Sequence, residues 1–491
     1  MTRALRYSRR TFLGGMAIAG LAPCVPGFAA VPSRRPRIAG KVIARGDARY
    51  EEWRRGMPWQ MVKPNRYPDL IVQPRNAEDV AASLKFAQRN GLRVAVKSGG
   101  HHVWANFLRN DGMLLDLSQL HGVSIDAESR RAQAGPAVWA RNLIQQTLPH
   151  GLAFPVAHCA TVPLGGFLLG GGFGLNGDEW GTMSCFAVRG AEVVTAAGDI
   201  VTVDASRNQD LYWALRGAGN GFPGVVTRFD LQLYPSPPRV LTSTYVFPAA
   251  RIEDVATFAR DLAQSSPPHT EILGIAAIGG RDAAGRNQVI CALRIAVFSL
   301  DPEQARSILE PLAAHPLVAS ALVKFESTPS DWETMFLESI NASRGFGFGR
   351  YAVDNLWTDA PENIMPILAD RLAGSPSPYA HAVVQFKVRT RIPADAALSR
   401  IAPAYAGVYS VWRDETADQL AQSWLRETMQ PLQRFAHGHY INEIDAEARP
   451  ASIESSFSDT AWKRLAGIRR SVDPGGVFHD FFAHRSTASG G

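Results

Sequence analysis

Two histidines stand directly behind a pair of glycines near residue 100 of this chain. The segment Val96-Lys97-Ser98-Gly99-Gly100-His101-His102 runs from a β-rich stretch into the glycines and then into the imidazoles. Glycine tolerates positive φ and lets bare backbone N–H groups approach an anionic ligand such as a pyrophosphate. A glycine turn followed by a surface histidine is also common, so this segment needs a partner before it indicates a function.

A second segment begins with Cys159 and is unusually rich in glycine. Its six glycines are Gly165, Gly166, Gly170, Gly171, Gly172 and Gly174. They are too many for an ordinary helix or strand, because each glycine loses more conformational entropy on folding than another residue would. The run lacks the Gly-Lys-Ser/Thr of a phosphate-binding loop and the Gly-x-Gly-x-x-Gly of a dinucleotide-binding helix. We therefore expect something to lie against this backbone, while Cys159, taken alone, fits a buried structural thiol.

The stretches around these segments predict a parallel strand-helix-strand unit. Residues 70–72 and 93–96 have the composition of strands, and residues 77–90 between them predict an amphipathic helix closed by Gly91. The glycines before His101 then come where a ligand can approach the end of a strand. Further strands are predicted at residues 112–117, 192–195 and 200–202, the last two joined in a hairpin.

A proline-rich stretch at Pro235, Pro237 and Pro238 marks a predicted domain boundary. Beyond it the sequence predicts an α+β region of its own. Its strands are predicted at residues 275–278 and 289–298, and its helices at residues 302–314 and 417–435.

Length and composition exclude several classes of protein. The 491 residues, 46% hydrophobic and 20% charged, suffice for two globular domains. The net charge of +6 falls to +2 without the four arginines of the first thirty residues, so no electrostatic argument favours a nucleic-acid partner. The four cysteines are too few and too widely spaced for a disulfide framework, and no Cys/His spacing predicts a metal site.

The first thirty residues are predicted to be an export signal. Ser8-Arg9-Arg10-Thr11-Phe12-Leu13 resembles the twin-arginine motif, and the apolar stretch after it, broken by Pro23, is too short to cross a membrane. We expect cleavage near Ala29 or Ala30, export by the twin-arginine machinery, and a periplasmic or secreted protein without a stable membrane anchor. A lipid anchor on Cys24 is the weaker alternative.

Together these segments resemble a known flavoprotein family. The glycine-histidine segment, the Cys159 run, Asp210-Leu211-Tyr212-Trp213 and Gly221-Phe222-Pro223-Gly224-Val225-Val226-Thr227 are similar to the FAD-binding domain of the vanillyl-alcohol-oxidase superfamily. The similarity is closest to the berberine-bridge-enzyme-like branch, and it resumes at His439-Tyr440-Ile441-Asn442 and Asp473-Pro474-Gly475-Gly476.

The resemblance implies an α+β fold of two domains. A PCMH-type FAD-binding fold would be joined to an α+β substrate domain with an antiparallel sheet. The expected division is a signal peptide at 1–30, the FAD domain at 31–237, the substrate domain at 238–445, and a segment at 446–491 that returns to the FAD domain.

The resemblance also implies how the cofactor is held. His101 would bond to the 8α-methyl of FAD and Cys159 to its C6 position, with His102 as the competing histidine. The glycine run would lie along the pyrophosphate and donate backbone amides. In the family, the position of Val162 helps decide whether dioxygen reaches the flavin, and valine goes with oxidases. The other expected FAD contacts are Ser98, Gly99, Gly100, Gly165, Gly166, Gly170, Gly171, Gly172, Phe173, Gly174, Gly224, Val225 and Val226.

The reaction implied is the oxidation of an alcohol, either a sugar or another secondary alcohol. Tyr440 is the candidate base and Asn442 its polar support, with hydride passing to the flavin and dioxygen reduced to hydrogen peroxide. Tyrosine is a poor base at neutral pH, so we expect a neighbour that lowers its pKa. A purely structural role for Tyr440 remains the alternative.

Two departures from the family leave other functions open. Ser410, before Trp412, would stand where plant members carry a glutamate base, and His479-Asp480-Phe481-Phe482 replaces the usual closing Asn-x-Asn. The alternatives are a dehydrogenase that passes electrons to a quinone or protein acceptor, and a flavin-binding protein without turnover.

Three tryptophans could form a sugar-stacking platform. They are Trp180, Trp357 and Trp412. We expect at least two of them to lie in the core instead, because large aromatic residues are mostly buried.

Overall fold

A computed structural model describes residues 35–342 and 349–479 of the chain. The predicted signal peptide, Cys24 and residues 480–482 of the altered closing motif lie outside the described residues. Among the described residues, no helix is long and apolar enough to cross a membrane.

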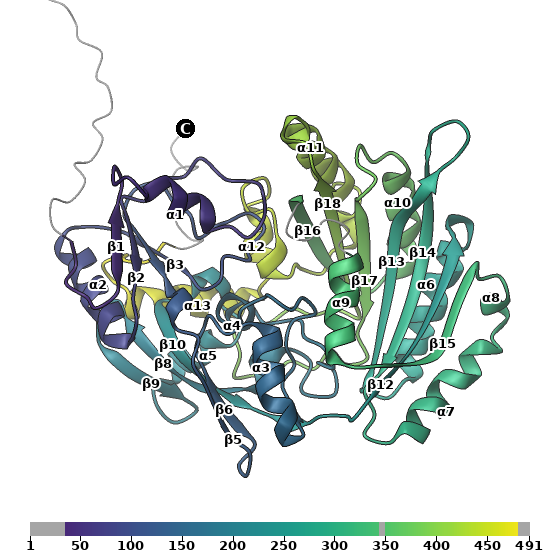
Figure 1. Cartoon of the computed structure of the whole chain (residues 1–491), viewed down its shortest axis with the longest axis horizontal. Helices are drawn as coiled ribbons and strands as arrows, with labels where there is room; N and C mark the ends of the chain where they lie inside the picture. Colours follow the sequence, from purple (N-terminus) through teal and green to yellow (C-terminus); the bar gives the residue numbers. More distant parts are fainter. Residues whose placement is uncertain (1–34, 343–348, 480–491) are drawn as a thin grey trace, which may run out of the picture. The chain divides into compact units, whose positions relative to one another are not determined.

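The two strands of the predicted parallel unit belong to a four-stranded sheet, in the order β1-β2-β4-β3 (Figure 1). Strands β2 (Leu70–Gln73) and β3 (Val94–Lys97) both run parallel to β4 (Met113–Asp116), which lies between them. The connecting helix α2 (Ala77–Arg89) begins where the Asn76 side chain accepts the Asp79 N–H, and its apolar residues pack against the sheet. Strand β1 (Lys41–Ala44) adds an antiparallel edge.

Residues 477–479 return to this sheet. Val94 N donates to Val477 O at 2.7 Å, and His479 N donates to Val94 O at 2.9 Å. Val94 and Phe478 form a parallel bridge, so the closing segment pairs with β3 along its free side. His479 is thereby brought to the strand that leads into the glycine-histidine segment.

An antiparallel sheet of five strands follows, in the order β5-β6-β10-β8-β9. Its hairpin between β8 and β9 turns at Gly198, whose φ of +80° suits glycine. The strands are β5 (Val123–Asp126), β6 (Arg131–Ala134), β8 (Val188–Thr195), β9 (Ile200–Asp204) and β10 (Gly224–Gln232). The helices of this part are α1 (Tyr50–Gly56), α3 (Ala140–Thr147), α4 (Leu164–Leu169), α5 (Gln209–Leu215) and α13 (Asp459–Val472).

The region after the prolines is built on a seven-stranded antiparallel sheet, in the order β15-β12-β14-β13-β17-β18-β16. Its strands are β12 (Val240–Pro248), β13 (Thr270–Arg281), β14 (Asn287–Val297), β15 (Val323–Ser330), β16 (Arg350–Thr358), β17 (His381–Phe386) and β18 (Ala404–Trp412). Helices α6 (Ile252–Ser265), α7 (Pro302–Ala313), α10 (Pro361–Ala373) and α11 (Asp418–Met429) pack against it, whereas α9 (Trp332–Ala342) lies in front of it in Figure 1.

The predicted helix at 417–435 is too long. Helix α11 ends at Met429, and only a short 3-10 turn follows at Gln433–Phe435. Pro431 accounts for the end, because proline has no backbone N–H with which to continue the helical hydrogen bonds, although Gln430 before it still has helical dihedral angles. The chain is then free to turn toward the segment that carries Tyr440.

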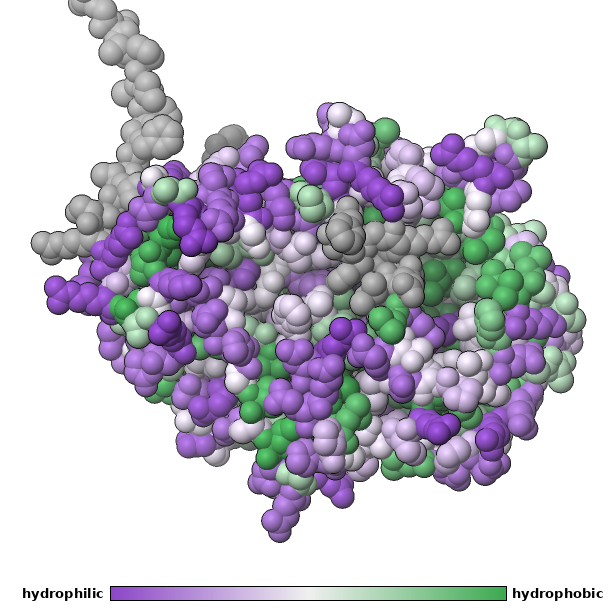
Figure 2. All heavy atoms as spheres, viewed as in Figure 1, coloured by the Kyte–Doolittle hydropathy of each residue, from purple (hydrophilic) through white to green (hydrophobic). Residues whose placement is uncertain are grey.

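The visible face of the molecule mixes hydrophilic and hydrophobic side chains (Figure 2). Several large hydrophobic residues are exposed near the start of β15, among them Leu322, Val323 and Phe325. The domain boundaries predicted from the sequence stay a prediction. A fourth, two-stranded sheet pairs β7 (Leu152–Ala153) with β11 (Tyr234–Pro235).

Candidate active site

One cavity of about 860 Å³ brings the two glycine-rich segments to the seven-stranded sheet. Strand alternation explains which residues of the sheet reach it. On β17, His381, Val383 and Gln385 line the cavity, while the residues between them pack under the helices. On β18, Tyr405 and Tyr409 line the cavity by the same alternation.

His101 is held by the segment before β2. The Trp59 ring stacks on the His101 ring at 4.5 Å between centroids and 13° between planes. Gly100 makes this approach possible, because its φ is +76° and a Cβ there would lie 2.0 Å from Met57 O. Trp59 N also donates to Gly100 O at 3.2 Å. Glycine at position 100 thus serves a close backbone contact.

Gln60 ties this segment to the seven-stranded sheet. Its Nε2 donates to Val103 O at 2.6 Å and to Tyr351 O at 3.1 Å, and its Oε1 accepts the Tyr351 N–H at 2.7 Å. Gln60 is buried, so these bonds are shielded from water. One amide side chain therefore fixes the histidine segment against β16.

Cys159 lies beside His101, as the resemblance requires. Cys159 Sγ is 3.7 Å from His101 Nε2 and 3.6 Å from Thr161 Oγ1, and Thr161 Oγ1 is 3.4 Å from the same imidazole nitrogen. The two residues are 58 positions apart in the chain, and only the fold brings them together.

The protonation of this pair follows from burial. Burial lowers the pKa of His101 to about 4 and raises the pKa of the Cys159 thiol. At neutral pH the site therefore holds a neutral imidazole beside a thiol. The imidazole can accept the thiol proton when the sulfur attacks an electrophile, so each group is chemically able to form a covalent link.

The glycine run is used differently from the prediction. Gly165 and Gly166 line the cavity, and Gly166 is open on the side where a Cβ would stand. Gly170, Gly171, Gly172 and Gly174 do not line it. The amides of Gly170 and Gly171 donate to carbonyls at the end of α4, and that of Gly165 donates to Pro136 O. The prediction that these amides face the pyrophosphate is wrong for those three residues, because protein carbonyls already bind them.

The later glycines instead permit close packing of protein against protein. A Cβ at Gly170 would lie 2.0 Å from Asn442 Oδ1, and one at Gly172 would lie 2.8 Å from Ser184 Cβ. A Cβ at Gly174 would lie 2.3 Å from Pro155 O. What lies against this backbone is mainly the chain itself.

The remaining predicted cofactor contacts divide by the face on which they lie. Gly99 and Val225 do not line the cavity, because Gly99 packs on Pro163 and Val225 points into the core beside the four-stranded sheet. The contacts that do line it are Ser98, Gly100, His101, Cys159, Val162, Phe173, Gly224 and Val226.

Tyr440 and Asn442 also line the cavity. Asn442 Nδ2 donates to Tyr440 Oη at 3.0 Å and to Phe167 O at 3.3 Å, so the two side chains are in direct contact. Burial and the nearby Glu443 nevertheless raise the pKa of Tyr440. The expected hydrogen-bonding neighbours are present in Asn442 and the Phe173 backbone, but burial and the Glu443 carboxyl group outweigh them, so the pKa is not lowered overall.

Three further side chains belong to the site and were missed by the sequence analysis. Tyr405 and Tyr409 both donate to Oε2 of Glu443, the second at 3.0 Å. Glu443 comes directly after Asn442, and that adjacency was the one signal that could have pointed to it. The tyrosines come from β18, and only the pairing of that strand places them here.

Ser410 does not stand where a base would act. It is fully buried and donates to Ala421 O on α11 at 3.0 Å, so it faces away from the cavity. Its neighbour Tyr409 occupies the cavity face. All three tryptophans of the possible stacking platform are buried, which confirms the expectation that at least two are core residues.

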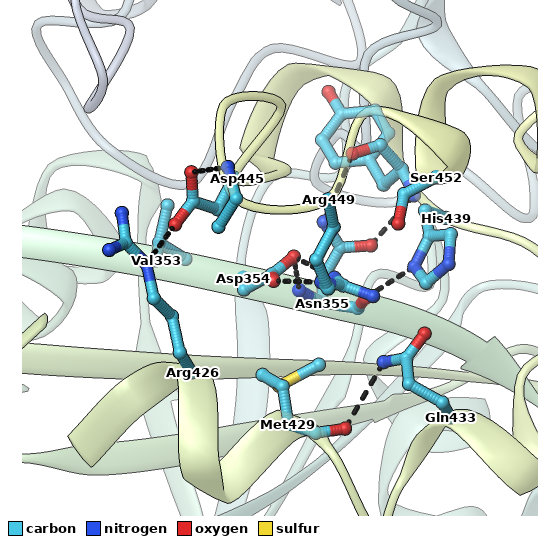
Figure 3. Close-up of polar contacts among 12 residues, drawn as sticks. Val353, Asp354, Asn355, Arg426, Met429, Gln433, His439, Asp445, Arg449 and Ser452 are labelled. Atoms are coloured by element: carbon cyan, nitrogen blue, oxygen red, sulfur yellow. Dashed lines mark hydrogen bonds and ion pairs between the residues drawn. The ribbon is translucent and has the colours of Figure 1, made fainter. Parts of the chain in front are cut away.

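A buried polar network holds the Tyr440 segment (Figure 3). Asn355 on β16 accepts the Tyr440 N–H at 2.7 Å and donates to Tyr440 O at 3.0 Å, and His439 Nδ1 lies 2.6 Å from Asn355 O. Asp354, which precedes Asn355 on β16, accepts a hydrogen bond from Arg449 Nε at 2.8 Å. Contacts that span more than 80 residues therefore position the reactive end of the cavity.

The donor set of the cavity fits FAD better than a metal. No cluster of three or more His, Cys, Asp or Glu side chains that could hold a metal ion occurs within residues 35–342 and 349–479. His102 lines the cavity, and its buried Nδ1 has no hydrogen-bond partner among those residues. The volume, the open face of Gly166, and the thiol beside an imidazole suit a large organic cofactor that forms covalent links.

Comparisons with known proteins agree with this fit. Residues 68–204 match a family described as FAD binding domain. The chain is 31% identical over 418 residues to FAD-linked oxidoreductase nodO of Hypoxylon pulicicidum, covering 84% of this chain and 90% of that protein. The crystal structure of 6-hydroxy-D-nicotine oxidase from Arthrobacter nicotinovorans superposes with a TM-score of 0.79 at 22% identity, covering 91% of this chain and 98% of the other. The structure of BBE-like 1 from Physcomitrella patens superposes with a TM-score of 0.76 at 18% identity, covering 90% of this chain and 96% of the other.

Fold and cavity together define a flavoprotein with an α+β, PCMH-type FAD-binding fold. The chain belongs to the family of FAD-linked oxidoreductases. It is accordingly an FAD-dependent oxidoreductase.

Proposed function

We propose that this enzyme oxidises an alcohol and holds FAD through both His101 and Cys159. The observation that carries the proposal is the single cavity that joins these two residues to Tyr440, Asn442 and the polar face of the seven-stranded sheet. A nucleophile pair at one wall and hydrogen-bonding groups at the other are what a covalent flavin and an oriented substrate require.

Each side chain has a stated task. His101, kept in plane by Trp59, and Cys159 tether the cofactor, and Thr161 orients the sulfur. When bound, FAD accepts a hydride from the substrate carbon and returns two electrons to dioxygen, which gives hydrogen peroxide. Tyr440 and Asn442 form one hydrogen-bonded unit that orients the substrate hydroxyl.

The lining of the sheet supports a sugar or another polar secondary alcohol as the substrate. Thr242 and Thr244 on β12 and Gln385 on β17 line the cavity with hydroxyl and amide groups. Tyr405 and Tyr409 add aromatic rings with hydroxyl groups. Hydroxyl-rich substrates bind to such mixed surfaces, because each polar group finds a partner while the rings cover C–H faces.

Val162 supports reoxidation of the reduced flavin by dioxygen rather than transfer of its electrons to a quinone or protein acceptor. It is half-buried and lines the cavity three residues after Cys159. Its backbone is fixed by hydrogen bonds to Cys159 O and from Ala140 N. Anaerobic reduction followed by mixing with air tests this choice, since an oxidase regains its yellow colour rapidly and a dehydrogenase does so slowly.

The tethers are tested by denaturing the purified enzyme in acid and recording where the yellow colour goes. We expect it to stay with the wild type and with His101→Ala and Cys159→Ala, and to wash out only in the double variant. His102→Ala and Cys185→Ala are the matched controls, because one is the competing histidine and the other is a buried thiol that does not line the cavity. Colour that washes out of the wild type would refute covalent attachment.

The substrate class is tested by anaerobic bleaching of the bound flavin. Sugars, aromatic alcohols, aliphatic secondary alcohols and cyclic amines are screened in turn, with peroxide release recorded in air. Bleaching by alcohols alone supports the proposal. Bleaching by amines alone would contradict an alcohol substrate and point to amines as the substrate class. If no compound bleaches the flavin, a flavin-binding protein without turnover would be favoured.

Export by the twin-arginine route is part of the same proposal. Arg9 and Arg10 within the first thirty residues support it. Changing both to lysine is expected to leave the protein in the cytoplasm, as fractionation of the producing cells would reveal. Unchanged export of this variant would argue for another route.

A further inference from the structure

Glu443 is a carboxyl group in the cavity to which no role has been given so far. It is half-buried on the 3-10 turn Ile441–Glu443 and lines the cavity with Tyr440 and Asn442. The two groups predicted for catalysis therefore have a third immediately beside them.

The hydrogen bonds of Glu443 involve only one of its two carboxylate oxygens. The hydroxyl groups of Tyr405 and Tyr409 both donate to Oε2. Oε1 has no hydrogen-bond partner within the described ranges 35–342 and 349–479. A carboxylate fixed by two donors on one oxygen presents the other in a defined direction, which is the geometry a proton acceptor needs.

The tyrosine pair is itself held in place. The His381 ring stacks on the Tyr409 ring at 5.0 Å and 8°, and the Tyr405 ring meets the Phe173 ring at 5.3 Å. Tyr405 and Tyr409 are four residues apart on β18, so their side chains lie on the same face of the strand. Both hydroxyl groups therefore reach the same oxygen. These rings have little freedom to release Glu443.

The surroundings of Glu443 make its carboxylate a stronger base than an ordinary glutamate. Burial raises the pKa of Glu443, while the hydrogen bonds from Tyr405 and Tyr409 and the charge of His158 oppose the rise. His158, from the segment before Cys159, is paired with Glu271 at 3.1 Å. Tyr440 faces Glu443 from the same turn, and His381 lies behind Tyr409.

The same neighbourhood argues against Tyr440 as the base. Burial and the charge of Glu443 together raise the pKa of the Tyr440 hydroxyl, so that hydroxyl keeps its proton. Two adjacent groups cannot both carry negative charge cheaply in a buried cavity. The carboxyl group is the stronger acid of the two, so it loses its proton first and is the one available to accept a proton from the substrate.

We propose that Glu443, fixed by Tyr405 and Tyr409, is the catalytic base that accepts the hydroxyl proton of the substrate through Oε1. This assignment rests on the proposed alcohol oxidation. The O–H proton goes to Oε1, the O–H electron pair forms the second bond of the carbonyl group, and the C–H hydrogen leaves with its electron pair to the bound FAD. The substrate thus loses two electrons and two hydrogens, and dioxygen takes up both electrons.

The test compares Glu443→Gln, Glu443→Asp and Tyr440→Phe, with Glu427→Gln as the matched control on the exposed side of α11. Flavin bleaching is followed anaerobically across pH with an alcohol that bleaches the wild type. We expect Glu443→Gln to bleach about 10²- to 10⁴-fold more slowly and to lose the fall in rate at acid pH. Glu443→Asp should recover part of the rate and keep the acid limb. A large loss in Tyr440→Phe with little change in Glu443→Gln would overturn the proposal.

A second measurement needs no substrate. Infrared difference spectra of the flavin-loaded enzyme, recorded during a pH titration, should contain a carboxyl band that titrates above the ordinary range of glutamate and is absent in Glu443→Gln. Tyr405→Phe and Tyr409→Phe should move that titration to higher pH, because each removes a donor to the carboxylate. A spectrum in which no band depends on Glu443 would overturn the proposal.

The two measurements separate this inference from the proposed function. If amines rather than alcohols bleach the wild type, the alcohol proposal fails, and a loss of the amine rate in Glu443→Gln still identifies the proton acceptor. If nothing bleaches the wild type, the infrared titration alone decides whether Glu443 is a poised base.

Discussion

The cofactor wall and the substrate wall of the cavity are built in different ways. At the cofactor wall, His101 and Cys159 each lie in a short glycine-containing segment that marks the residue in the sequence, although Trp59, which stacks on His101, comes from a distant segment. At the substrate wall, Tyr440 and Glu443 depend on Asn355, Tyr405 and other residues that are 34 to 85 positions away.

This difference teaches where function is encoded locally and where it is not. A covalent tether needs one nucleophile at one place, so a compact motif can specify it. An oriented base needs several groups from different strands, so it can form only after the sheet has closed. We therefore expect substitutions at the two walls to impair the enzyme in different ways.

The largest effect is expected from breaking the buried pair behind the substrate wall. Arg449→Met leaves Asp354, which is 1% exposed, without its charged partner. Removing one member of such a pair costs about 4 kcal/mol of unfolding free energy, because a buried carboxyl stays uncompensated. Denaturant unfolding measures the loss.

The matched control for that pair is Arg286→Met, which breaks a solvent-exposed pair with Asp282 and should cost far less unfolding free energy than Arg449→Met. Burial already raises the pKa of Asp354, so in Arg449→Met this carboxyl binds a proton more readily when folded than when unfolded. The deficit should therefore shrink as pH falls. Equal losses in the two variants would show that the buried network contributes nothing special.

A similar but slightly smaller effect is expected at the cofactor wall from Gly100→Ala. The new Cβ would meet Met57 O, and the left-handed backbone strains any residue other than glycine, so we expect about 3 kcal/mol of destabilisation and loss of the flavin link at His101. Unfolding and the yellow colour after acid denaturation measure the two effects.

Gly91→Ala separates the effect of backbone strain at positive φ from the effect of a steric clash with Met57 O. Gly91 has a φ of +64°, but a Cβ there would meet nothing within 4 Å. We expect a cost of about 1 kcal/mol and an intact flavin link. If Gly100→Ala behaves like Gly91→Ala, the close approach to Met57 is not what positions His101.

The next largest effect at the substrate wall is expected in the pH dependence of stability. Burial lowers the pKa of His439 to about 4. Between an ordinary histidine pKa near 6.5 and that value the unfolded chain binds more protons than the folded one, so His439 weakens the fold as pH falls through this window. His439→Gln should flatten the curve by about 2 to 3 kcal/mol between pH 6.5 and 4, measured by urea unfolding. Parallel curves for variant and wild type would contradict this.

The sequence predicted the cofactor wall better than the substrate wall for the same physical reason. His101, Cys159 and the parallel unit around α2 follow from segments whose spacing is fixed within the chain. The roles of Gly170 and Gly171 could not be predicted, because a glycine pattern does not reveal whether a ligand or another part of the protein lies against it.

Ser410 and Tyr409 illustrate the limit at the substrate wall. They are adjacent in sequence, but strand alternation sends one toward α11 and the other into the cavity. A shift of one residue in the expected register is therefore enough to name the wrong side chain. Glu443 was missed because its importance depends on two tyrosines from β18, which sequence spacing alone does not place.

The smallest effect is expected from the residue that connects the two walls. Gln60→Leu keeps the volume but leaves the buried Tyr351 N–H and two carbonyl groups without the partners described above, which should cost about 2 kcal/mol. Because Gln60 adjoins Trp59, the link at His101 should form more slowly, which the growth of acid-stable colour after adding FAD to the apoprotein would measure. Gln433→Leu, which removes only a bond to Met429 O, is the control and should change neither quantity. If Gln60→Leu loses stability but links flavin at the normal rate, the two walls form independently, and the contrast between them extends to their assembly.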